Sequence, residues 1–306
     1  MASNRNGSIH LFRFAGVNVF LHWSWFVVAY FQIGYRANLP NGYTSWHWMA
    51  LEYLALFAIV LLHEFGHALA CRSVGGRADQ IILWPLGGVA FVDPPPRPGA
   101  TLWSIAAGPL VNVGLMPVLV VLWMLGKALH WHELDPNLFN FISMLCLMNG
   151  ALFCFNMLPI FPLDGGQILQ SILWFWLGRA RSLMVTSAIG LAASVAAIVL
   201  LLVYARGEIW LLIMAVFVVF NCWRGLQQAR AMSRVDTAPR RLELACPKCK
   251  ASPPVGNYWG CGRCRAGFDI FATRGVCPNC GTIFNEVRCQ ECGETSPLYS
   301  FNKTGS

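Results

Sequence analysis

The sequence predicts an all-α polytopic membrane protein of about six transmembrane helices, with a small membrane-associated β hairpin or sheet and a soluble C-terminal domain. Two observations predict the membrane part. Of the 306 residues, 56% are hydrophobic and only 12% are charged, against about 25% charged in ordinary soluble domains. The apolar residues also lie in long runs. A third observation predicts the soluble domain, because cysteine, glycine and charge become dense after about residue 225.

Six apolar runs are long enough to cross a bilayer, since about 20 apolar residues span the hydrocarbon core as a helix. The first run lacks the small-residue cleavage site of a secretory signal, so we expect it to be retained. The predicted spans are residues 17–35, 47–71, 101–126, 138–163, 183–205 and 208–223.

The positive charges predict the orientation of these spans. With six spans, twelve arginines fall on one side of the membrane, and only Arg36, Lys127 and Arg206 fall on the other. Positive residues are retained on the cytoplasmic side, so both termini of this integral membrane protein are predicted to be cytoplasmic. The net charge of +8 then follows from topology and requires no nucleic-acid partner.

Two short segments are predicted to form strands rather than spans. Residues 8–14 are too short and too mixed to cross a membrane, and we expect a strand at its surface. Residues 81–91 resemble a hairpin with Gly87 and Gly88 as its turn. Pro85 cannot donate to a strand ladder, so this hairpin should have an open edge.

The pattern HExxH occurs once, as HEFGH at residues 63–67. His63 and His67 are four residues apart, so a helix places them on one face, where both can bind one zinc ion. Glu64 can act there as general base on a zinc-bound water. The alternative is a chance match on an ordinary helix. That alternative is weak here, because each unpaired charge in a membrane helix costs about 2.5–3.5 kcal/mol.

A catalytic zinc takes three protein ligands as a rule, and the third ligand can be sought by elimination. Glu52 lies three turns before His63, and Glu133 and Glu208 fall at the opposite membrane face. His22 is favoured as a satisfied polar residue near the interface. Asp164 remains, at the end of a span that reaches the same depth as the two histidines. Its alternative role is a helix-capping carboxylate.

The backbone around Asp164 should be irregular. Pro159 and Pro162 interrupt the helix, and Gly165 and Gly166 permit a tight turn. Irregular backbone at membrane depth is tolerated where it is buried in protein or lines a water-filled cavity, and hydrolysis requires water.

These motifs resemble the site-2 protease family of intramembrane zinc metalloproteases. The resemblance rests on HEFGH at 63–67, GPLVN at 108–112, LWPLGGVA at 83–90 and NMLPIFPLDGG at 156–166. It covers roughly residues 8–225. It implies that His63, His67 and Asp164 bind zinc and that Glu64 is the catalytic base and acid. It also implies a prokaryotic source and cleavage of transmembrane segments, often within regulated intramembrane proteolysis.

Three further residues are candidates for substrate binding. Asn156 could hydrogen-bond a substrate carbonyl or the oxyanion, or it could tie two helices together. Gly87 and Gly88 lie in the predicted hairpin, to which an unwound substrate could add as a strand. Asn112 is favoured as a residue that packs and hydrogen-bonds between helices.

Eight of the twelve cysteines form four CxxC pairs, which predict two structural zinc sites of four thiolates each. The predicted cytoplasmic side is reducing, which disfavours disulfides, and no thioredoxin-like pattern supports a redox role. We expect two zinc ribbons in tandem. The first would contain Cys246, Cys249, Cys261 and Cys264, and the second Cys277, Cys280, Cys289 and Cys292.

The predicted domains are a transmembrane metalloprotease domain at 1–225, a linker at 226–244, the ribbons at 245–295 and a flexible tail at 296–306. Three zinc ions are expected, one catalytic and two structural. The partners would be a membrane-protein substrate, the lipid bilayer and a cytoplasmic regulator docked on the ribbons. The basic excess of the ribbons is too small for nucleic acid, and the sequence does not determine the oligomeric state. The alternative function is a non-proteolytic membrane scaffold or metal-handling protein with structural zinc.

Overall fold

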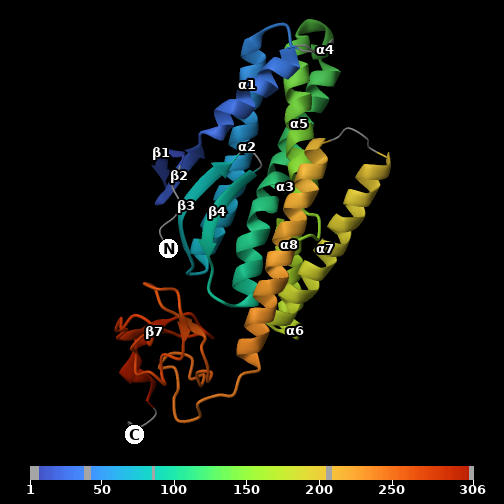
Figure 1. Cartoon of the computed structure of the whole chain (residues 1–306). Coiled ribbons are helices and arrows are strands. Elements are labelled where there is room, and N and C mark those ends of the chain that lie inside the picture. The colour runs from blue at the N-terminus through green and yellow to red at the C-terminus, as the bar shows by residue number, and fades with distance from the viewer. Residues whose placement is uncertain (1–6, 38–42, 85–86, 205–208, 303–306) are drawn as a thin grey trace.

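The structure is a computed structural model that describes residues 7–37, 43–84, 87–204 and 209–302. It is a mostly helical membrane protein with one small sheet and a cysteine-rich C-terminal domain (Figure 1). The elements of the membrane part are β1 Ser8–Phe14, β2 Val17–His22, α1 Ser24–Ala37, α2 Trp46–Ser73, β3 Arg77–Trp84, β4 Gly87–Asp93, α3 Pro98–Ala128, α4 Trp131–Leu134, α5 Pro136–Asn156, α6 Asp164–Leu177, α7 Arg179–Tyr204 and α8 Ile209–Asp236.

Five of the described helices are long and apolar enough to cross a membrane, namely α2, α3, α5, α7 and α8. The predicted first span differs from the structure. Residues 17–22 form strand β2, because Val17 and Val19 are completely buried in the sheet core, and only the 14 residues of α1 are helical. The predicted fourth span is shorter than expected, since α5 ends at Asn156, before Pro159.

The sheet lies against α2 and has the strand order β1-β2-β3-β4. Strands β2 and β3 are parallel and are connected through α1 and α2, whereas the other two pairs are antiparallel. Ile81 and Leu83 of β3 pack with Phe65 and Ala68 of α2 in one apolar core. This core fixes β4 as an edge strand beside the HExxH helix.

The predicted hairpin is present, but its turn is not at Gly87 and Gly88. Both glycines belong to β4, where they pair with Trp84 and Leu83. The connection between β3 and β4 falls at residues 85–86, which lie outside the described residues.

The C-terminal domain has one apolar core and several short elements. These are β5 Trp259–Gly260, β6 Gly267–Phe268, β7 Glu286–Arg288, β8 Thr295–Pro297 and the 3-10 helix Leu298–Phe301. The core contains Trp259, Phe268, Ile270, Val287 and Phe301. The prediction of a flexible tail from residue 296 is therefore wrong for residues 296–302, because these residues are folded against the core and Phe301 is only 1% exposed.

The segment before this domain is held to it by an ion pair. Arg241 Nη2 lies 2.6 Å from Asp269 Oδ2. Burial alone would raise the pKa of the Asp269 carboxyl. Hydrogen bonds from the Gly256 amide and the Arg241 guanidinium outweigh burial and hold this pKa below its usual value. The helical part of the predicted linker is the end of α8, which continues to Asp236.

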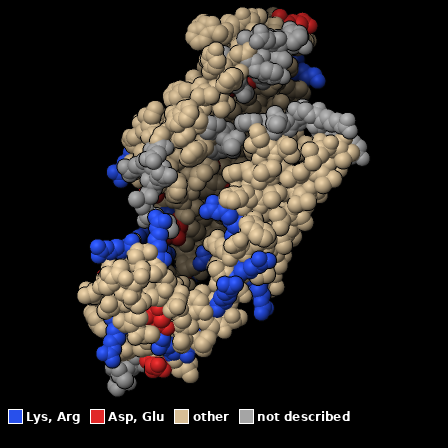
Figure 2. Space-filling view, viewed as in Figure 1, with Lys and Arg blue, Asp and Glu red and all other residues tan. Residues whose placement is uncertain are grey.

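Charged side chains are unevenly distributed over the surface. In Figure 2 the lysines and arginines gather on the C-terminal domain and on the helix ends that face it, while most of the helical body above is uncharged. Apolar side chains are exposed along α3, α7 and α8, for example Val121, Leu202 and Phe217. This distribution is that of a membrane-embedded body with one strongly basic end.

Candidate metal centre

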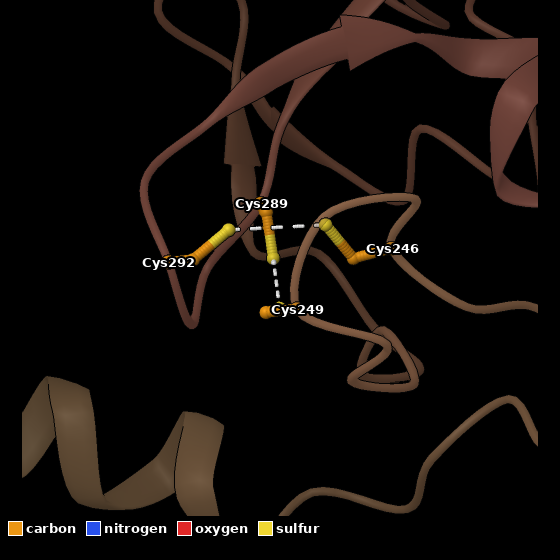
Figure 3. Close-up of side chains that lie close together, drawn as sticks. All are labelled: Cys246, Cys249, Cys289 and Cys292. Atoms are coloured by element: carbon orange, nitrogen blue, oxygen red, sulfur yellow. Dashed lines mark hydrogen bonds between the residues drawn. The ribbon is translucent and has the colours of Figure 1, made fainter.

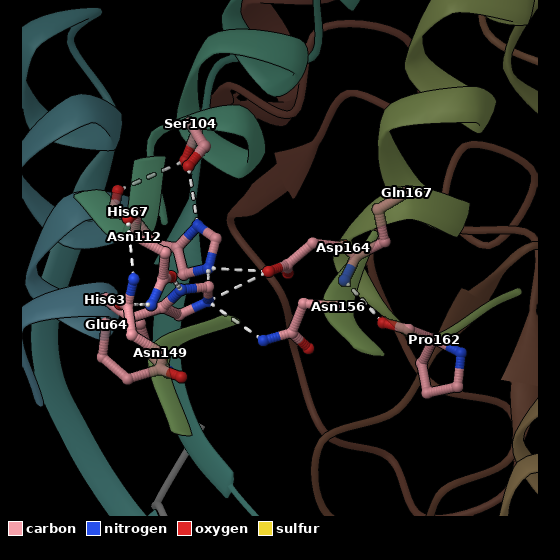
Figure 4. Close-up of polar contacts among 11 residues, drawn as sticks. His63, Glu64, His67, Ser104, Asn112, Asn149, Asn156, Pro162, Asp164 and Gln167 are labelled. Atoms are coloured by element: carbon pink, nitrogen blue, oxygen red, sulfur yellow. Dashed lines mark hydrogen bonds and ion pairs between the residues drawn. The ribbon is translucent and has the colours of Figure 1, made fainter. Parts of the chain in front are cut away.

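Helix α2 and the start of α6 bring three potential ligands together in the interior of the protein. His63 and His67 are 2% and 5% exposed. The Nε2 atoms of the two rings lie 3.0 and 3.4 Å from Asp164 Oδ2, and 3.1 Å from each other (Figure 4). His63 and Asp164 are 101 positions apart in the sequence, and the fold places the three ligand atoms within 4.8 Å of one another.

The far side of each imidazole ring is held by helix α3. His63 Nδ1 lies 2.5 Å from Asn112 Oδ1, and His67 Nδ1 lies 3.0 Å from the Ser104 carbonyl oxygen. Both acceptors require a proton on Nδ1, so both Nε2 atoms present a lone pair toward Asp164. Such contacts orient metal-binding histidines and fix their tautomers. The predicted hydrogen bonding of Asn112 between helices is therefore directed at one of the two histidines.

Helix α3 can approach the histidines this closely because residue 108 is glycine. A β-carbon at Gly108 would overlap His67 Nε2 and would lie 2.9 Å from His63 Nε2. Gly66 of α2 allows the same approach from the other helix, since its β-carbon would lie 2.7 Å from the Ala107 carbonyl oxygen. The GPLVN segment thus contributes both the space beside the rings and the Asn112 amide.

Asp164 is positioned by the irregular segment that precedes it. The Cys222 thiol of α8 donates to the Phe161 carbonyl over 2.8 Å, and Gln167 Nε2 donates to the Pro162 carbonyl over 2.9 Å. Helix α8 and the first turn of α6 therefore brace the segment between α5 and α6. This bracing determines where the Asp164 carboxylate lies relative to α2.

Glu64 lies between the histidines and the open edge of the sheet. Its side chain is 7% exposed, and Oε2 accepts a hydrogen bond from the Ala90 amide of β4 over 2.9 Å. A β-carbon at Gly88 would lie 2.6 Å from Glu64 Oε1. Gly88 is therefore required for the close approach of β4 to Glu64, which is a different role from the predicted turn.

The other candidates occupy distinct positions. Asn156 Nδ2 lies 3.5 Å from His63 Nε2, so this amide borders the centre (Figure 4). His22 stacks on Trp84 and hydrogen-bonds Ser24, away from the three ligands. Sequence reasoning missed Asn149, which bonds Asn112. The available signal was an amide in the middle of an apolar helix, the same signal that identified Asn156.

The donor set fits a zinc ion. Two imidazole nitrogens and one carboxylate oxygen form a ligand set of catalytic zinc sites, in which a fourth position stays open. The ring nitrogens already face a common point, and their outer nitrogens already have acceptors. Glu64 is adjacent to this point without being one of the three grouped ligands.

The cysteines form two groups of four, but the groups differ from the prediction. Cys246 and Cys249 group with Cys289 and Cys292 (Figure 3), and Cys261 and Cys264 group with Cys277 and Cys280. The predicted tandem pairing is therefore wrong, and the two sites are nested. The physical reason is that the two ends of the domain pair with each other, since the Ala245 amide donates to the Phe301 carbonyl over 2.8 Å.

The sulfur separations fit two closed metal sites. Within the groups, bonded Sγ pairs lie 3.6 to 3.8 Å apart. Tetrahedral coordination with Zn–S distances near 2.3 Å places sulfurs about 3.8 Å apart. A disulfide would bring two sulfurs to about 2.05 Å, and all twelve cysteines of the chain, which lie within the described residues, are free thiols. Both groups fit structural zinc.

This protein combines a buried His-His-Asp group, a neighbouring glutamate and apolar helices. That combination is typical of membrane zinc metalloproteases. The sequence model of peptidase family M50 matches residues 52–131 and 130–202. A zinc metalloprotease of Methanocaldococcus jannaschii is 32% identical over 238 residues, which cover 78% of this chain and 65% of the relative. Stage IV sporulation protein FB of Bacillus subtilis is 35% identical over 130 residues, which cover 42% of this chain and 41% of the relative.

A solved structure is also similar. The site-2 protease from Methanocaldococcus jannaschii has a TM-score of 0.50 and 27% sequence identity, covering 72% of this chain and 95% of that chain. This chain belongs to peptidase family M50, the site-2 proteases. It spans less than two thirds of the length of the archaeal metalloprotease and of the Bacillus protein.

Proposed function

We propose that this protein is an intramembrane zinc metalloprotease that hydrolyses peptide bonds in or near the transmembrane segments of protein substrates, in regulated intramembrane proteolysis. One observation carries the proposal. The Glu64 carboxylate borders the His63, His67 and Asp164 group and accepts a hydrogen bond from Ala90 of the edge strand β4 (Figure 4). A general base, a metal centre and a surface for an extended peptide therefore meet at one point.

His63, His67 and Asp164 would hold the catalytic zinc. When bound, the ion would lower the pKa of a water molecule and polarise the scissile carbonyl. Glu64 would take a proton from the attacking water and then give it to the amine nitrogen as the C–N bond breaks. The products are one carboxylate and one amine. Asn156, whose amide borders the histidines, would donate to the carbonyl oxygen of the scissile bond.

The expected test compares Glu64→Gln with wild type in detergent. The probe is a maltose-binding protein fused to a single transmembrane segment, and the readouts are cleavage on a gel and zinc per chain. Glu64→Gln should retain its zinc and lose cleavage by at least about a hundredfold, as expected for a general base. Glu52→Gln is the matched control, because Glu52 is a 3% exposed carboxylate on the same helix. Equal cleavage by Glu64→Gln and wild type would contradict the role of Glu64 as general base. Absence of cleavage by zinc-loaded wild type would favour a scaffold.

The substrate is proposed to bind as an added strand on β4. A transmembrane helix shields its carbonyls by internal hydrogen bonds, so its peptide must unwind before hydrolysis. The Ala90 amide faces Glu64 rather than β3. Because amides alternate in direction along a strand, the amides of Gly88 and Val92 face the same open edge. An extended peptide added there would run past Glu64.

Val92→Pro tests strand addition without altering Glu64. The substitution removes one edge amide, and cleavage of the single-span fusion should fall about tenfold or more with zinc content unchanged. Leu11→Pro is the control, because Leu11 lies at the bulge of β1 on the opposite edge of the sheet. Full cleavage of the fusion by Val92→Pro would exclude strand addition at this edge.

The proposal extends to topology and to the C-terminal domain. Both termini are proposed to be cytoplasmic in a prokaryotic cell membrane, which the basic end of the molecule supports (Figure 2). The two nested cysteine groups would hold structural zinc, giving three ions per chain. Their domain is proposed to dock a protein regulator or substrate at the cytoplasmic side.

A further inference from the structure

Two asparagines form a closed pair between helices α3 and α5, next to the metal centre. Asn112 and Asn149 are both completely buried. Asn112 Nδ2 donates to Asn149 Oδ1 over 2.8 Å, and Asn149 Nδ2 donates to the Asn112 backbone carbonyl over 3.0 Å (Figure 4). On its other side, Asn112 Oδ1 contacts His63 Nδ1. The bonds therefore run in sequence from Asn149 through Asn112 to His63.

These bonds fix the orientation of both amides. A backbone carbonyl accepts only, so the Asn149 end that faces the Asn112 carbonyl must be Nδ2. Its Oδ1 then faces the Asn112 side chain, which must present Nδ2 in return. The remaining Asn112 atom, Oδ1, is left to face His63 and accepts only from a protonated Nδ1. Turning either amide over would place donor against donor or acceptor against acceptor at a site with no solvent exposure, where unsatisfied polar groups are costly.

We propose that Asn149 is a positioning residue for the metal centre, which orients the Asn112 amide and through it fixes the tautomer of His63. The proposal rests on the metal site of the proposed function and assigns a role to a residue whose hydrogen bonds are to Asn112 and not to His63, His67 or Asp164. Without Asn149, the Asn112 amide can turn over and present Nδ2 to His63. The ring would then keep its proton on Nε2, the atom that faces Asp164, and could not bind metal there.

The competing interpretation is that Asn149 only joins two helices, as polar residues do in membrane proteins. The two interpretations predict different losses. A helix-joining residue contributes to thermal stability. A positioning residue also changes the zinc affinity of a site to which it is not bonded. Outer partners of metal-binding histidines typically contribute about 10–100-fold in metal affinity.

The first measurement compares full-length wild type and Asn149→Leu. Zinc per chain is followed during titration with a chelator, and the histidine side chains are observed by NMR after selective 15N labelling, which is practical for seven histidines. In wild type, His63 should carry its proton on Nδ1. In Asn149→Leu, the catalytic zinc should be lost at about tenfold lower chelator concentration, with the cysteine-bound zinc unchanged. Thr186→Val is the control, because it removes a buried hydroxyl bonded only within α7.

The second measurement is a rescue. In Asn112→Asp/Asn149→Leu, the carboxylate at position 112 accepts from His63 in either orientation, so no partner on α5 is needed. Zinc affinity should return to within about threefold of wild type, as the carboxylate–histidine–zinc arrangement predicts. Failure of the double variant to bind zinc more tightly than Asn149→Leu would overturn the proposal. So would a wild-type His63 protonated on Nε2, a result that requires no variant to fold.

These outcomes are separable from failure of the proposed function. If wild type held zinc only in its cysteine groups, the metal centre itself would be wrong. If wild type held three zinc ions and Asn149→Leu matched it throughout the chelator titration, only the positioning role would be wrong.

Discussion

At the scale of single residues, the candidate metal centre depends on two glycines, whose lack of a side chain leaves space, as much as on the candidate ligands. Gly108 leaves room beside the two imidazole rings, and Gly88 lets strand β4 reach Glu64. Neither glycine has a positive φ angle, so their requirement is steric and not conformational. The surrounding helices are close-packed, and an added methyl group has no space that it can take without moving a functional atom.

Gly108→Ala should therefore abolish catalytic zinc binding. The new β-carbon would overlap His67 Nε2, and small-to-large changes in a packed interior cost about 1–3 kcal/mol even where the neighbours can move. Zinc per chain, measured by atomic emission, should fall by one, with the cysteine groups still filled. Gly114→Ala is the control in the same helix, because its β-carbon meets nothing within 4 Å. Three zinc ions in Gly108→Ala would show that α3 does not limit this space.

The candidate ligands and the candidate base could be predicted from the sequence, but the residues that support them could not. His63, Glu64 and His67 follow from helix periodicity, and Asp164 follows from the depth at which two spans end. The bonds of Ser104 and Asn149 depend on the rotation and register of α3 and α5 against their neighbours. Apolar membrane helices contain no strong periodic signal for that register, because lipid-facing and buried residues are similar in character.

At the scale of elements, helices α7 and α8 act on the centre through the segment before Asp164. Gly190 of α7 lies against Cys222 of α8, and a β-carbon there would meet Cys222 Sγ at 2.7 Å and the Phe161 amide nitrogen at 3.2 Å. Cys222 in turn bonds the Phe161 carbonyl. Neither helix contributes a residue to the His-His-Asp group, yet both contact the segment that leads to Asp164.

Gly190→Ala should weaken catalytic zinc binding through this contact. The substitution should displace Cys222 and the Phe161 backbone, lower the free energy of unfolding by about 1–3 kcal/mol and reduce zinc affinity measurably in a chelator titration. The second substitution Cys222→Ala removes the obstructing sulfur, so Gly190→Ala/Cys222→Ala should recover part of both losses. A double variant worse than either single variant would contradict this steric account.

Element boundaries were less predictable than element types. Residues 17–22 are apolar enough for a span, but their burial pattern is that of a central strand. Helix α6 was not predicted, because Pro159 and Pro162 mark an interruption without showing that a helix resumes at Asp164. The strand at residues 8–14 and the CxxC pairs were recognised, since both depend on short local patterns.

At the scale of the whole molecule, the nested cysteine groups make the C-terminal domain one unit. The outer group joins the first CxxC pair to the last. Cys246 lies 46 residues before Cys292, and Cys249 lies 40 residues before Cys289. The inner group lies between these two pairs in the sequence. Sequence spacing favoured neighbouring pairs. The observed grouping instead follows from the pairing of Leu244 with Asn302 and from a single apolar core. A small domain of this kind gains much of its folding energy from metal.

Cys292→Ser distinguishes nested from tandem pairing by the cysteines it exposes. In the nested arrangement, the variant should lose one zinc, and Cys246, Cys249 and Cys289 should become reactive to N-ethylmaleimide. Cys261, Cys264, Cys277 and Cys280 should stay protected because their group is intact. Peptide mass spectrometry assigns the labelled thiols, and Cys154→Ser, at an exposed cysteine outside both groups, is the control. Labelling of Cys277 and Cys280 with protection of Cys246 and Cys249 would restore the tandem arrangement. The two halves of the domain could then fold separately. In the nested arrangement, by contrast, the site that contains Cys246 is complete only when Cys289 and Cys292 have folded against it.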